Sequence, residues 1–369
     1  MHMHILHLVS NISIRNGIMS VVMNYYRNID KKKFTFDFLY FEDRSDNFYD
    51  EIKSLGGNCY KINYNNNINL FNQIRKFIKN NIFNYDIIHI HEIYLIGTFI
   101  GLKKYNSKIK IISHAHATKF SENNLKNIRN MLFSIPNIVV PDYYFACSKL
   151  AGIKLFGRKF KNKGYILNNA INLDNFAKNK AASELIRKKY KIEDKFVIGH
   201  VGNFNVQKNH TFLIDIFNCL CKINPNVVLL LVGDGNKKDE ILLKIKKLNL
   251  EKKVIYLGVR NDVNKIMNAF DCFVLPSIYE GLGIVLIEAQ AIGLPCVFSD
   301  TVPQEANIIK RQNRILSLNN SAEIWANEII NVKKLHNVSG TYEVRTAGYD
   351  IVCEAKKLAE KYKKIVEDN

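Results

Sequence analysis

The sequence predicts an α/β protein built from two doubly wound domains, each with a mostly parallel sheet covered by helices on both faces. Short apolar runs of strand length alternate with segments of helical period along the whole chain. Strands buried on both faces of a parallel sheet read as such continuous apolar runs. The length of 369 residues exceeds what one ordinary core accommodates and suits two domains.

The first half of the chain alternates strands and helices from its beginning. Gly17 precedes a helical pattern and follows a polar loop at residues 10–16. A helix is expected to end at Gly56 and Gly57, because glycine readily adopts the left-handed conformation that follows a helix. Residues 70–79 have the pattern of an amphipathic helix. The expected strands are residues 5–9, 34–41, 59–62, 85–91, 110–116, 143–147 and 165–167.

The second half repeats this organisation. Gly202 ends its first strand, and a polar loop then leads into a helix that begins at about His210. The expected strands are residues 196–201, 227–232, 254–257, 271–275 and 295–298. We therefore place one domain at residues 1–170, a second at 171–347 and a lysine-rich amphipathic helix in the tail at 348–369.

The composition is that of a globular protein with a strong positive charge. The 53 lysines and arginines outnumber the 34 aspartates and glutamates, for a net charge of +19. Such a charge attracts nucleic acid, anionic lipid surfaces or phosphorylated small molecules without choosing among them.

No apolar run approaches the roughly 20 residues of a membrane span. Because the first residues also lack the pattern of a secretory signal, we expect a cytoplasmic protein. The seven cysteines form no Cys-x-x-Cys pair, which favours buried thiols over disulfides.

One stretch near the C-terminal third, residues 273–289, has the pattern of a ligand site. An apolar run ends at Pro276, a turn containing Gly281 and Gly283 follows, and a helical pattern begins at Ile284. The first amides of a helix have no internal partner and lie at its positive end, so this geometry suits an anion. Glu280 and Glu288 bracket the turn, and carboxylates accept hydrogen bonds from sugar hydroxyls. The stretch therefore predicts a site for a nucleotide sugar.

Other polar residues are expected at the same edge of the sheets, because ligands of doubly wound sheets lie beyond the carboxyl ends of the strands. Lys208 precedes a helix and could neutralise a phosphate leaving group; a solvated surface lysine is the alternative. We expect two domains that face each other across a cleft, with Lys208, Gly17 and His116 meeting the 273–289 stretch across it. The full set at these edges comprises Gly17, His91, His114, His116, residues 202–208, residues 233–235 and residues 280–284.

Two histidine pairs also end strands. His114 and His116 are two residues apart on one strand and so point the same way, as do His89 and His91. Zinc normally takes three or four protein ligands, so we expect no metal. For His89 and His114 we favour buried, hydrogen-bonded histidines, whereas His116 could position a hydroxyl or share a developing charge.

The two glutamates have an alternative interpretation as a glycosidase-like acid and base. Such a pair must flank one scissile bond, whereas Glu280 precedes the turn and Glu288 lies within the following helix. This arrangement suits two hydroxyl groups of one ligand better. A charged residue inside an otherwise apolar helix is rare without a partner, which favours a functional role for Glu288.

These residues resemble the retaining glycosyltransferases of family 4, whose GT-B fold has two Rossmann-like domains facing across a cleft. The resemblance covers essentially the whole chain. Its signature is a pair of glutamates separated by seven residues, which Glu280 and Glu288 match, and the pattern is most similar to enzymes of bacterial capsule, exopolysaccharide and O-antigen clusters. Supporting matches are residues 202–209, 257–262, 168–172 and 112–117.

The resemblance implies a role for each matching position. Glu280 would bind hydroxyls of the donor sugar, Glu288 the ribose and Lys208 the diphosphate. His116 resembles the histidine beside the reacting centre, and Gly17 the second glycine of a Gly-Gly loop near the diphosphate. The implied catalytic residues are His116, Glu280 and Lys208. The implied donor-binding residues are Gly17, Gly202, Asn203, Lys208, Arg260, Glu280, Gly281, Leu282, Gly283, Ile284, Val285 and Glu288, with no metal ligand and no cofactor.

Two positions depart from the family pattern. Asn203 stands where the family usually has an arginine, so the expected phosphate clamp loses one positive charge and depends more on Lys208. Asn16 replaces the first glycine of the Gly-Gly loop. The family further implies an acceptor-binding N-terminal domain, a donor-binding C-terminal domain and a last helix that crosses back to the N-terminal domain.

The expected activity is metal-independent transfer from a nucleotide sugar, a UDP-sugar by resemblance, to a glycan or lipid-linked saccharide with retention of configuration. A non-hydrolysing UDP-sugar 2-epimerase is the alternative enzyme, with Asp86 and Glu92 as its candidate carboxylates near the strand end. A polyanion-binding protein is the alternative outside enzymes, although the sequence lacks a clustered basic motif. The positive charge favours peripheral contact with an anionic membrane over nucleic-acid binding.

Overall fold

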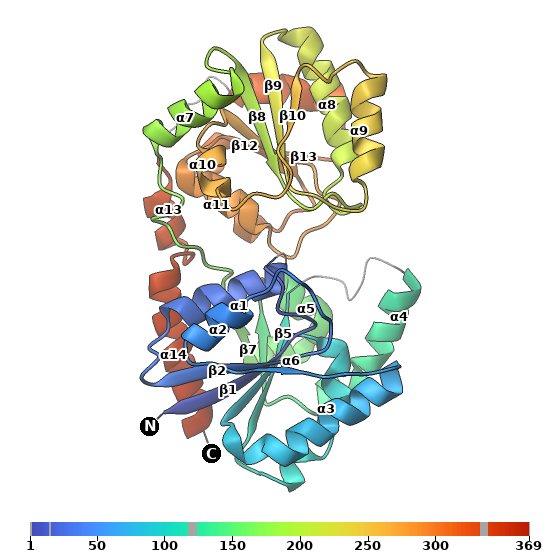
Figure 1. Ribbon diagram of the computed structural model, residues 1–369, viewed down its shortest axis with the longest axis vertical. Coiled ribbons are helices and arrows are strands. Elements are labelled where there is room, and N and C mark those ends of the chain that lie inside the picture. Colours follow the sequence, from blue (N-terminus) through green and yellow to red (C-terminus); the bar gives the residue numbers. More distant parts are fainter. Residues whose placement is uncertain (1, 15, 117–123, 333–338, 369) are drawn as a thin grey trace. The chain divides into compact units, whose positions relative to one another are not determined.

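The computed structural model describes residues 2–14, 16–116, 124–332 and 339–368. The chain divides into two compact units, the first comprising Met1–Ile171 with Asp350–Asn369 and the second Asn172–Tyr349. Each unit is built around one parallel sheet (Figure 1), which confirms the predicted α/β class. Ala117, the last residue of the 112–117 match, lies outside the described residues.

The first unit has a seven-stranded sheet in the order β3-β2-β1-β4-β5-β6-β7, with every neighbouring pair parallel. Its strands are β1 (Met3–Leu8), β2 (Phe34–Tyr40), β3 (Cys59–Lys61), β4 (Ile87–Ile90), β5 (Lys110–Ala115), β6 (Tyr143–Ala146) and β7 (Gly164–Ile166). All seven predicted strands are present. The order reverses between β1 and β4, the kind of switch point at which doubly wound sheets bind ligands.

Helices cover both faces of this sheet (Figure 1). Asn16 caps the first of them, because its side-chain oxygen accepts hydrogen bonds from the amides of Ile18 and Met19. The α-helices are α1 (Gly17–Asn28), α2 (Tyr49–Ser54), α3 (Asn67–Asn81), α4 (Asn124–Phe133), α5 (Lys149–Phe156), α6 (Arg158–Lys163) and α14 (Ile351–Glu367). Short 3-10 helices are η1 (Ile82–Asn84), η2 (Ile93–Phe99), η3 (Leu102–Lys104) and η4 (Ile135–Ile138).

Helix α14, at the end of the chain, packs against α1 and the sheet of the first unit. It begins three residues later than the predicted tail, because Gly348 adopts a left-handed conformation with φ of 87° and Asp350 caps the helix. The aromatic ring of Tyr362 is fully buried beside Phe36 and Phe145.

The second unit has a six-stranded parallel sheet in the order β10-β9-β8-β11-β12-β13. Its strands are β8 (Phe196–Val201), β9 (Val227–Val232), β10 (Val254–Tyr256), β11 (Cys272–Leu275), β12 (Cys296–Ser299) and β13 (Asn313–Leu316). The edge strand β13 was not predicted from the sequence, because only two of its four residues, Ile315 and Leu316, are apolar.

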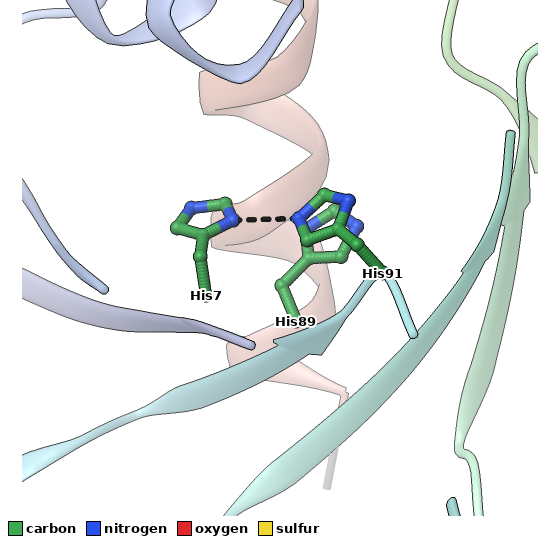
Figure 2. A group of neighbouring side chains, drawn as sticks. All are labelled: His7, His89 and His91. Atoms are coloured by element: carbon green, nitrogen blue, oxygen red, sulfur yellow. Dashed lines mark hydrogen bonds between the residues drawn. The ribbon is translucent and has the colours of Figure 1, made fainter. Parts of the chain in front are cut away.

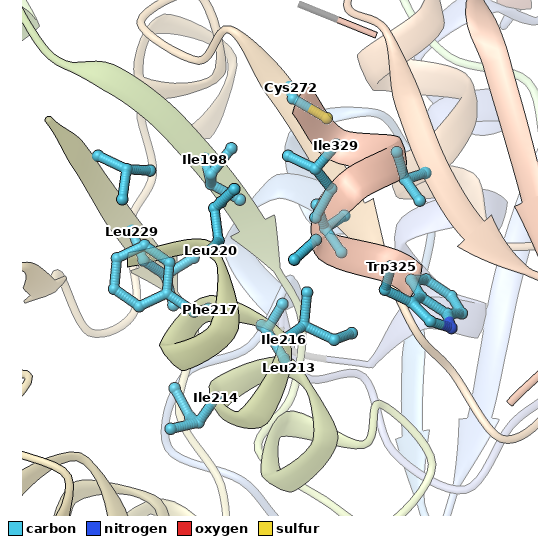
Figure 3. Close-up of a cluster of buried hydrophobic side chains, with 14 of the residues drawn as sticks. Ile198, Leu213, Ile214, Ile216, Phe217, Leu220, Leu229, Cys272, Trp325 and Ile329 are labelled. Atoms are coloured by element: carbon cyan, nitrogen blue, oxygen red, sulfur yellow. The ribbon is translucent and has the colours of Figure 1, made fainter. Parts of the chain in front are cut away.

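The helices of the second unit pack on both faces of its sheet. They are α7 (Lys180–Tyr190), α8 (His210–Ile223), α9 (Lys238–Lys247), α10 (Val263–Met267), α11 (Ile284–Ile292), α12 (Ala322–Val332) and α13 (Thr341–Thr346), with the 3-10 helices η5 (Gln304–Ala306) and η6 (Lys310–Gln312). Figure 3 shows the core in which α8 and α12 bury Phe217 and Trp325 against Ile198 and Leu229 of the sheet. The Trp325 indole N–H donates to the carbonyl of Ser317 at 3.2 Å.

The cysteines and the lengths of the apolar helices can be compared with the expectations from composition. All seven cysteines are free thiols. Among the helices in the described part of the chain, none is long and apolar enough to cross a membrane.

The core of the second unit gives a stability prediction. Replacing Phe217 with alanine should lower the free energy of unfolding by about 3–5 kcal/mol, because it leaves a cavity in a fully buried cluster. Trp325 is the single tryptophan of the chain and lies in the same cluster, so its fluorescence during urea unfolding reports on this unit. Leu185 of α7 is 70% exposed, and Leu185→Ala serves as the control. An unchanged urea midpoint for Phe217→Ala would contradict this description of the core.

Candidate active site

The predicted strand, glycine turn and helix are present in the second unit. Strand β11 ends at Leu275 and helix α11 begins at Ile284. Gly283 precedes the helix with φ of 85°, a backbone conformation that residues with a side chain rarely adopt. Because the first amides of a helix have no partner within it, α11 presents N–H groups and the positive end of its dipole at this turn.

A buried ion pair lies beside this turn. The Nζ atom of Lys208 is 2.7 Å from Oε1 of Glu280, and the Glu280 side chain is only 6% exposed. Ser277 Oγ donates to the same oxygen at 2.7 Å, and Gln207 Nε2 donates to Oε2 at 3.1 Å. Lys208 therefore meets Glu280 within the second unit, which corrects the expectation that the two meet across a cleft between domains.

The hydrogen bonds already made limit what this pair can bind. A carboxylate has about four acceptor positions, and Glu280 uses three of them on Lys208, Ser277 and Gln207. One position on Oε2 is left for a hydroxyl of a ligand. An ammonium group has three donors, so Lys208 retains two beyond the one it gives to Glu280, and phosphate oxygens are suitable acceptors for them.

The loops that carry the pair are joined to each other. The amide of Ile278 donates to the carbonyl of Gln207 at 2.8 Å. The carbonyl of Ser277 accepts from Ser299 Oγ and Thr301 Oγ1, both at 2.6 Å. Neither Gln207 nor Ser277 was singled out from the sequence. Gln207 directly precedes Lys208, but nothing in a single sequence shows that its side chain points at Glu280.

Glycines shape the floor of this site. A Cβ atom on Gly202 would lie 3.1 Å from Cγ of Lys208. Gly233 has φ of 130°, and a Cβ there would lie 2.0 Å from the carbonyl oxygen of Gly202. The ends of β8 and β9 can approach this closely because Gly233 has no Cβ. Asn203, which stands in place of the family arginine, has an exposed side chain here.

The remaining donor-site candidates of the second unit differ in environment. Glu288 lies in the second turn of α11 with a partly buried side chain, and desolvation raises its pKa to about 7 although nearby Lys208 opposes the shift. The guanidinium of Arg260 binds both carboxylate oxygens of Asp262 at 2.8 Å. Arg260 makes no hydrogen bond to Lys208, Glu280 or Glu288 among the described residues. Gly281, Leu282, Gly283, Ile284 and Val285 form the turn and the first residues of α11.

Gly17 and His116 belong to the first unit. A Cβ atom on Gly17, the first residue of α1, would have no atom within 4 Å. His116 directly follows β5, and its Nε2 lies 2.7 Å from Nδ1 of His91. His91 Nε2 in turn lies 2.9 Å from Nδ1 of His7, a residue not identified from the sequence (Figure 2).

A second pair of contacts joins the other two histidines. His89 Nε2 lies 3.1 Å from Nδ1 of His114, and His89 Nδ1 lies 2.7 Å from the hydroxyl of Tyr362. The prediction that His89 and His114 are buried and hydrogen-bonded is confirmed. Burial lowers the pKa of His7 and of His116 to about 3. It also holds the pKa values of His89, His91 and His114 well below the usual range, so all five imidazoles are neutral near pH 7.

The ring nitrogens of these histidines lie close enough together to be candidate metal ligands. In two groups of three, His7 with His89 and His91, and His91 with His114 and His116, one nitrogen of each residue lies within 4.8 Å of the others. Two nitrogens bound to one tetrahedral zinc ion at about 2.0–2.1 Å would be about 3.3 Å apart. The hydrogen-bonded nitrogens are 2.7–3.1 Å apart instead. This spacing matches a hydrogen-bonded network better than a set of metal ligands.

The candidate carboxylates of an epimerase do not both lie at the carboxyl edge. Asp86 lies at the amino end of β4, where its Oδ2 accepts from the amide of His4 at 2.9 Å, so its expected placement was wrong. Glu92 does follow the carboxyl end of β4. Its Oε1 accepts from the amide of Ser10 at 3.1 Å, and burial raises its pKa.

Comparison with known proteins identifies the family. Residues 182–343 match the family model described as glycosyl transferases group 1. A putative glycosyltransferase of Bacillus subtilis (strain 168), EpsF, is 33% identical over 334 residues, covering 88% of this chain and 86% of that protein. An Escherichia coli UDP-Gal:alpha-D-GlcNAc-diphosphoundecaprenol alpha-1,3-galactosyltransferase is 28% identical over 205 residues, covering 53% of this chain and 53% of that protein.

Solved structures show the same architecture. The crystal structure of Anabaena HepE in complex with UDP and glucose superposes with a TM-score of 0.81 at 17% identity, covering 98% of this chain and 100% of that chain. The two Rossmann-like sheets are those of the GT-B fold, as the sequence resemblance implied. On the strength of the EpsF match over most of both chains, this protein belongs to the group 1 glycosyltransferases.

Proposed function

We propose that this glycosyltransferase moves a hexosyl or N-acetylhexosaminyl group from a UDP-sugar to a glycan or lipid-linked saccharide in surface polysaccharide synthesis, with retention and without a metal. The observation that carries the proposal is the buried Lys208–Glu280 pair beside the start of α11. It places a cation and a carboxylate acceptor next to free helix amides. That combination suits a ligand with both phosphates and hydroxyls.

We assign each part of the donor substrate to protein groups that complement it: hydrogen-bond donors for its phosphates and acceptors for its hydroxyls. The two remaining donors of Lys208 and the first amides of α11 suit the diphosphate. The free acceptor position of Glu280 suits one sugar hydroxyl, and Glu288 suits the ribose. The choice of UDP is supported by the UDP in the HepE complex and by the UDP-galactose in the name of the Escherichia coli relative.

The reaction needs positive charge where the diphosphate leaves. As the bond between the anomeric carbon and the diphosphate breaks, Lys208 and the α11 amides stabilise the charge on the departing oxygen, the task a metal ion performs in other enzymes. The acceptor hydroxyl forms the new bond on the same face, and its proton passes to an oxygen of the leaving phosphate. His116 and Gly17, from the first unit, contact the reacting sugar and the diphosphate in this proposal.

The acceptor is assigned to the first unit. A pocket of about 140 Å³ lies beyond the carboxyl ends of β2, β3 and β4. Aromatic rings suit the apolar faces of sugars, and charged side chains suit their hydroxyls. Its lining includes Phe41, Glu42, Tyr64, Tyr94, Arg129 and Phe133.

Contact with a membrane is part of the proposal. The segment from α4 to η4 exposes apolar side chains, a feature that marks interaction surfaces, and the net charge of +19 favours an anionic bilayer carrying the lipid-linked acceptor. The exposed side chains are Met131, Leu132, Phe133, Ile135 and Val139.

Loss of either member of the buried pair should abolish transfer. Glu280→Ala and Lys208→Ala should each lower kcat by about 100-fold or more, as removal of a group that stabilises the transition state does. The measurement is UDP release from a panel of UDP-sugars with a saccharide acceptor, together with a thermal melt to show that each variant is folded. Glu280→Gln is a second variant that removes the negative charge but keeps a hydrogen-bond acceptor for Lys208 and nearly the same shape.

The exposed Lys180–Glu184 pair on α7 provides matched controls, because both side chains are more than half exposed. Lys180→Ala and Glu184→Ala should leave turnover unchanged. Wild-type turnover in folded Glu280→Ala and Lys208→Ala would contradict the proposed function.

The raised pKa of Glu288 predicts a pH dependence of donor binding. The ribose hydroxyls donate to the carboxylate, so binding requires the deprotonated form. Affinity for the donor should therefore rise about tenfold from about pH 6 to about pH 8, since the pKa lies between them. Titration calorimetry across this range tests the prediction. Glu288→Gln should bind more weakly with no pH dependence in this window, and an equal dependence in that variant would assign the titration to another group.

A further inference from the structure

Three histidines of the first unit form a continuous row, which we call the histidine row: the buried His7 and His91 and the partly buried His116. His7 of β1 pairs in register with His89 of β4, so His91 lies two residues beyond that level. The same offset relates His91 to His116, because His89 pairs with Ile112 of β5. Each contact of the row is thus a diagonal one between neighbouring parallel strands, toward the carboxyl edge of the sheet.

A row of neutral imidazoles has only two consistent arrangements of protons. Each neutral ring has one N–H donor and one bare nitrogen acceptor. His91 contacts a histidine with each of its nitrogens, at 2.9 Å to His7 and 2.7 Å to His116. It therefore donates to one neighbour and accepts from the other. Either every ring of the row donates outward, toward His116, or every ring donates inward, toward His7.

The inner end of the row distinguishes the two arrangements. His7 Nε2 is buried and has no hydrogen-bond partner among the described residues. Inward donation would place a proton on this atom and leave a buried N–H without an acceptor; among backbone groups, a buried N–H without a partner is rarer than an acceptor without one, and we apply the same preference to the imidazole. Outward donation leaves a bare nitrogen there instead. The proton of His7 then lies on Nδ1, that of His91 on Nδ1, and that of His116 on Nδ1.

The neighbouring contacts hold the row in place. The ring of His89 stacks on that of His91 with centroids 4.5 Å apart and planes within 12°. His89 is itself fixed by Tyr362 of α14 and by His114. Rotation of the His91 ring, which would exchange its nitrogens, is therefore opposed by packing on a fixed neighbour.

We propose that the histidine row fixes His116 as the tautomer with its proton on Nδ1, so that His116 acts toward ligands as a hydrogen-bond donor and not as a general base. His7 and His91 are then positioning residues for His116. The tautomer itself follows from contacts within the first unit, and only its use in catalysis depends on the proposed function. A donor at His116 is consistent with transfer of the acceptor proton to the leaving phosphate.

The tautomer can be measured without any substrate. Long-range proton–nitrogen correlation spectra of nitrogen-15-histidine-labelled protein near pH 7 distinguish a protonated from a bare ring nitrogen. His116→Gln assigns the signals of His116. We expect a protonated Nδ1 and a bare Nε2. A protonated Nε2, or about one equivalent of tightly bound transition metal in elemental analysis of the purified protein, would overturn the proposal.

Variants of His91 separate positioning from packing. His91→Phe keeps the ring but removes the donor to His116, so it should shift the His116 proton and lower kcat about tenfold, with KM for the donor changed by less than about twofold. His91→Gln retains an N–H donor and should keep kcat within about threefold of wild type. His114→Phe perturbs the same core outside the row and should leave the His116 proton on Nδ1.

Failure of the positioning role and failure of the proposed function give different results. Equal losses of kcat in folded His91→Phe and His91→Gln, with an unchanged His116 tautomer, would overturn the positioning role. A protein that turns over no nucleotide sugar but shows the expected spectrum would contradict the proposed function and leave the tautomer assignment standing.

Discussion

The buried ion pair between Lys208 and Glu280 is the interaction on which the candidate active site depends. Taking two opposite charges out of water costs several kcal/mol for each, and the attraction between them compensates only when geometry and further hydrogen bonds are good. Ser277 and Gln207 provide those hydrogen bonds. The residues of the pair are 72 positions apart in the chain, yet they meet because β8 and β11 are neighbours in the parallel sheet. The crossover topology of the second unit is thus what assembles its site.

The sequence was sufficient for most of the fold because strands buried on both faces of a sheet must be apolar throughout. Strands β8 and β9 have the predicted bounds, and helices α8 and α11 begin at the predicted residues. Strand β13 escaped prediction because an edge strand with half its residues polar has no such run. The start of α14 was misplaced because the tail pattern continues through Gly348, whose backbone conformation a pattern does not reveal.

The site was predicted as a set of residues rather than as a set of contacts. Resemblance to a family brought together Glu280, Glu288 and Lys208, but not the direct bond between Lys208 and Glu280 or its support by Ser277. In the first unit, the two histidine pairs were visible as repeated patterns at strand ends. His7 was not, because its contact with His91 depends on the register between β1 and β4, and one sequence does not specify that register.

In the proposed complex, Lys208 binds the diphosphate of the donor and Glu280 binds its sugar. Titration calorimetry of UDP and of the preferred UDP-sugar against wild type, Lys208→Met and Glu280→Gln tests this most directly. We expect Lys208→Met to weaken binding of both ligands, whereas Glu280→Gln should weaken binding of the UDP-sugar and leave that of UDP nearly unchanged. Equal weakening of both ligands by Glu280→Gln, or unaltered UDP binding in Lys208→Met, would contradict it.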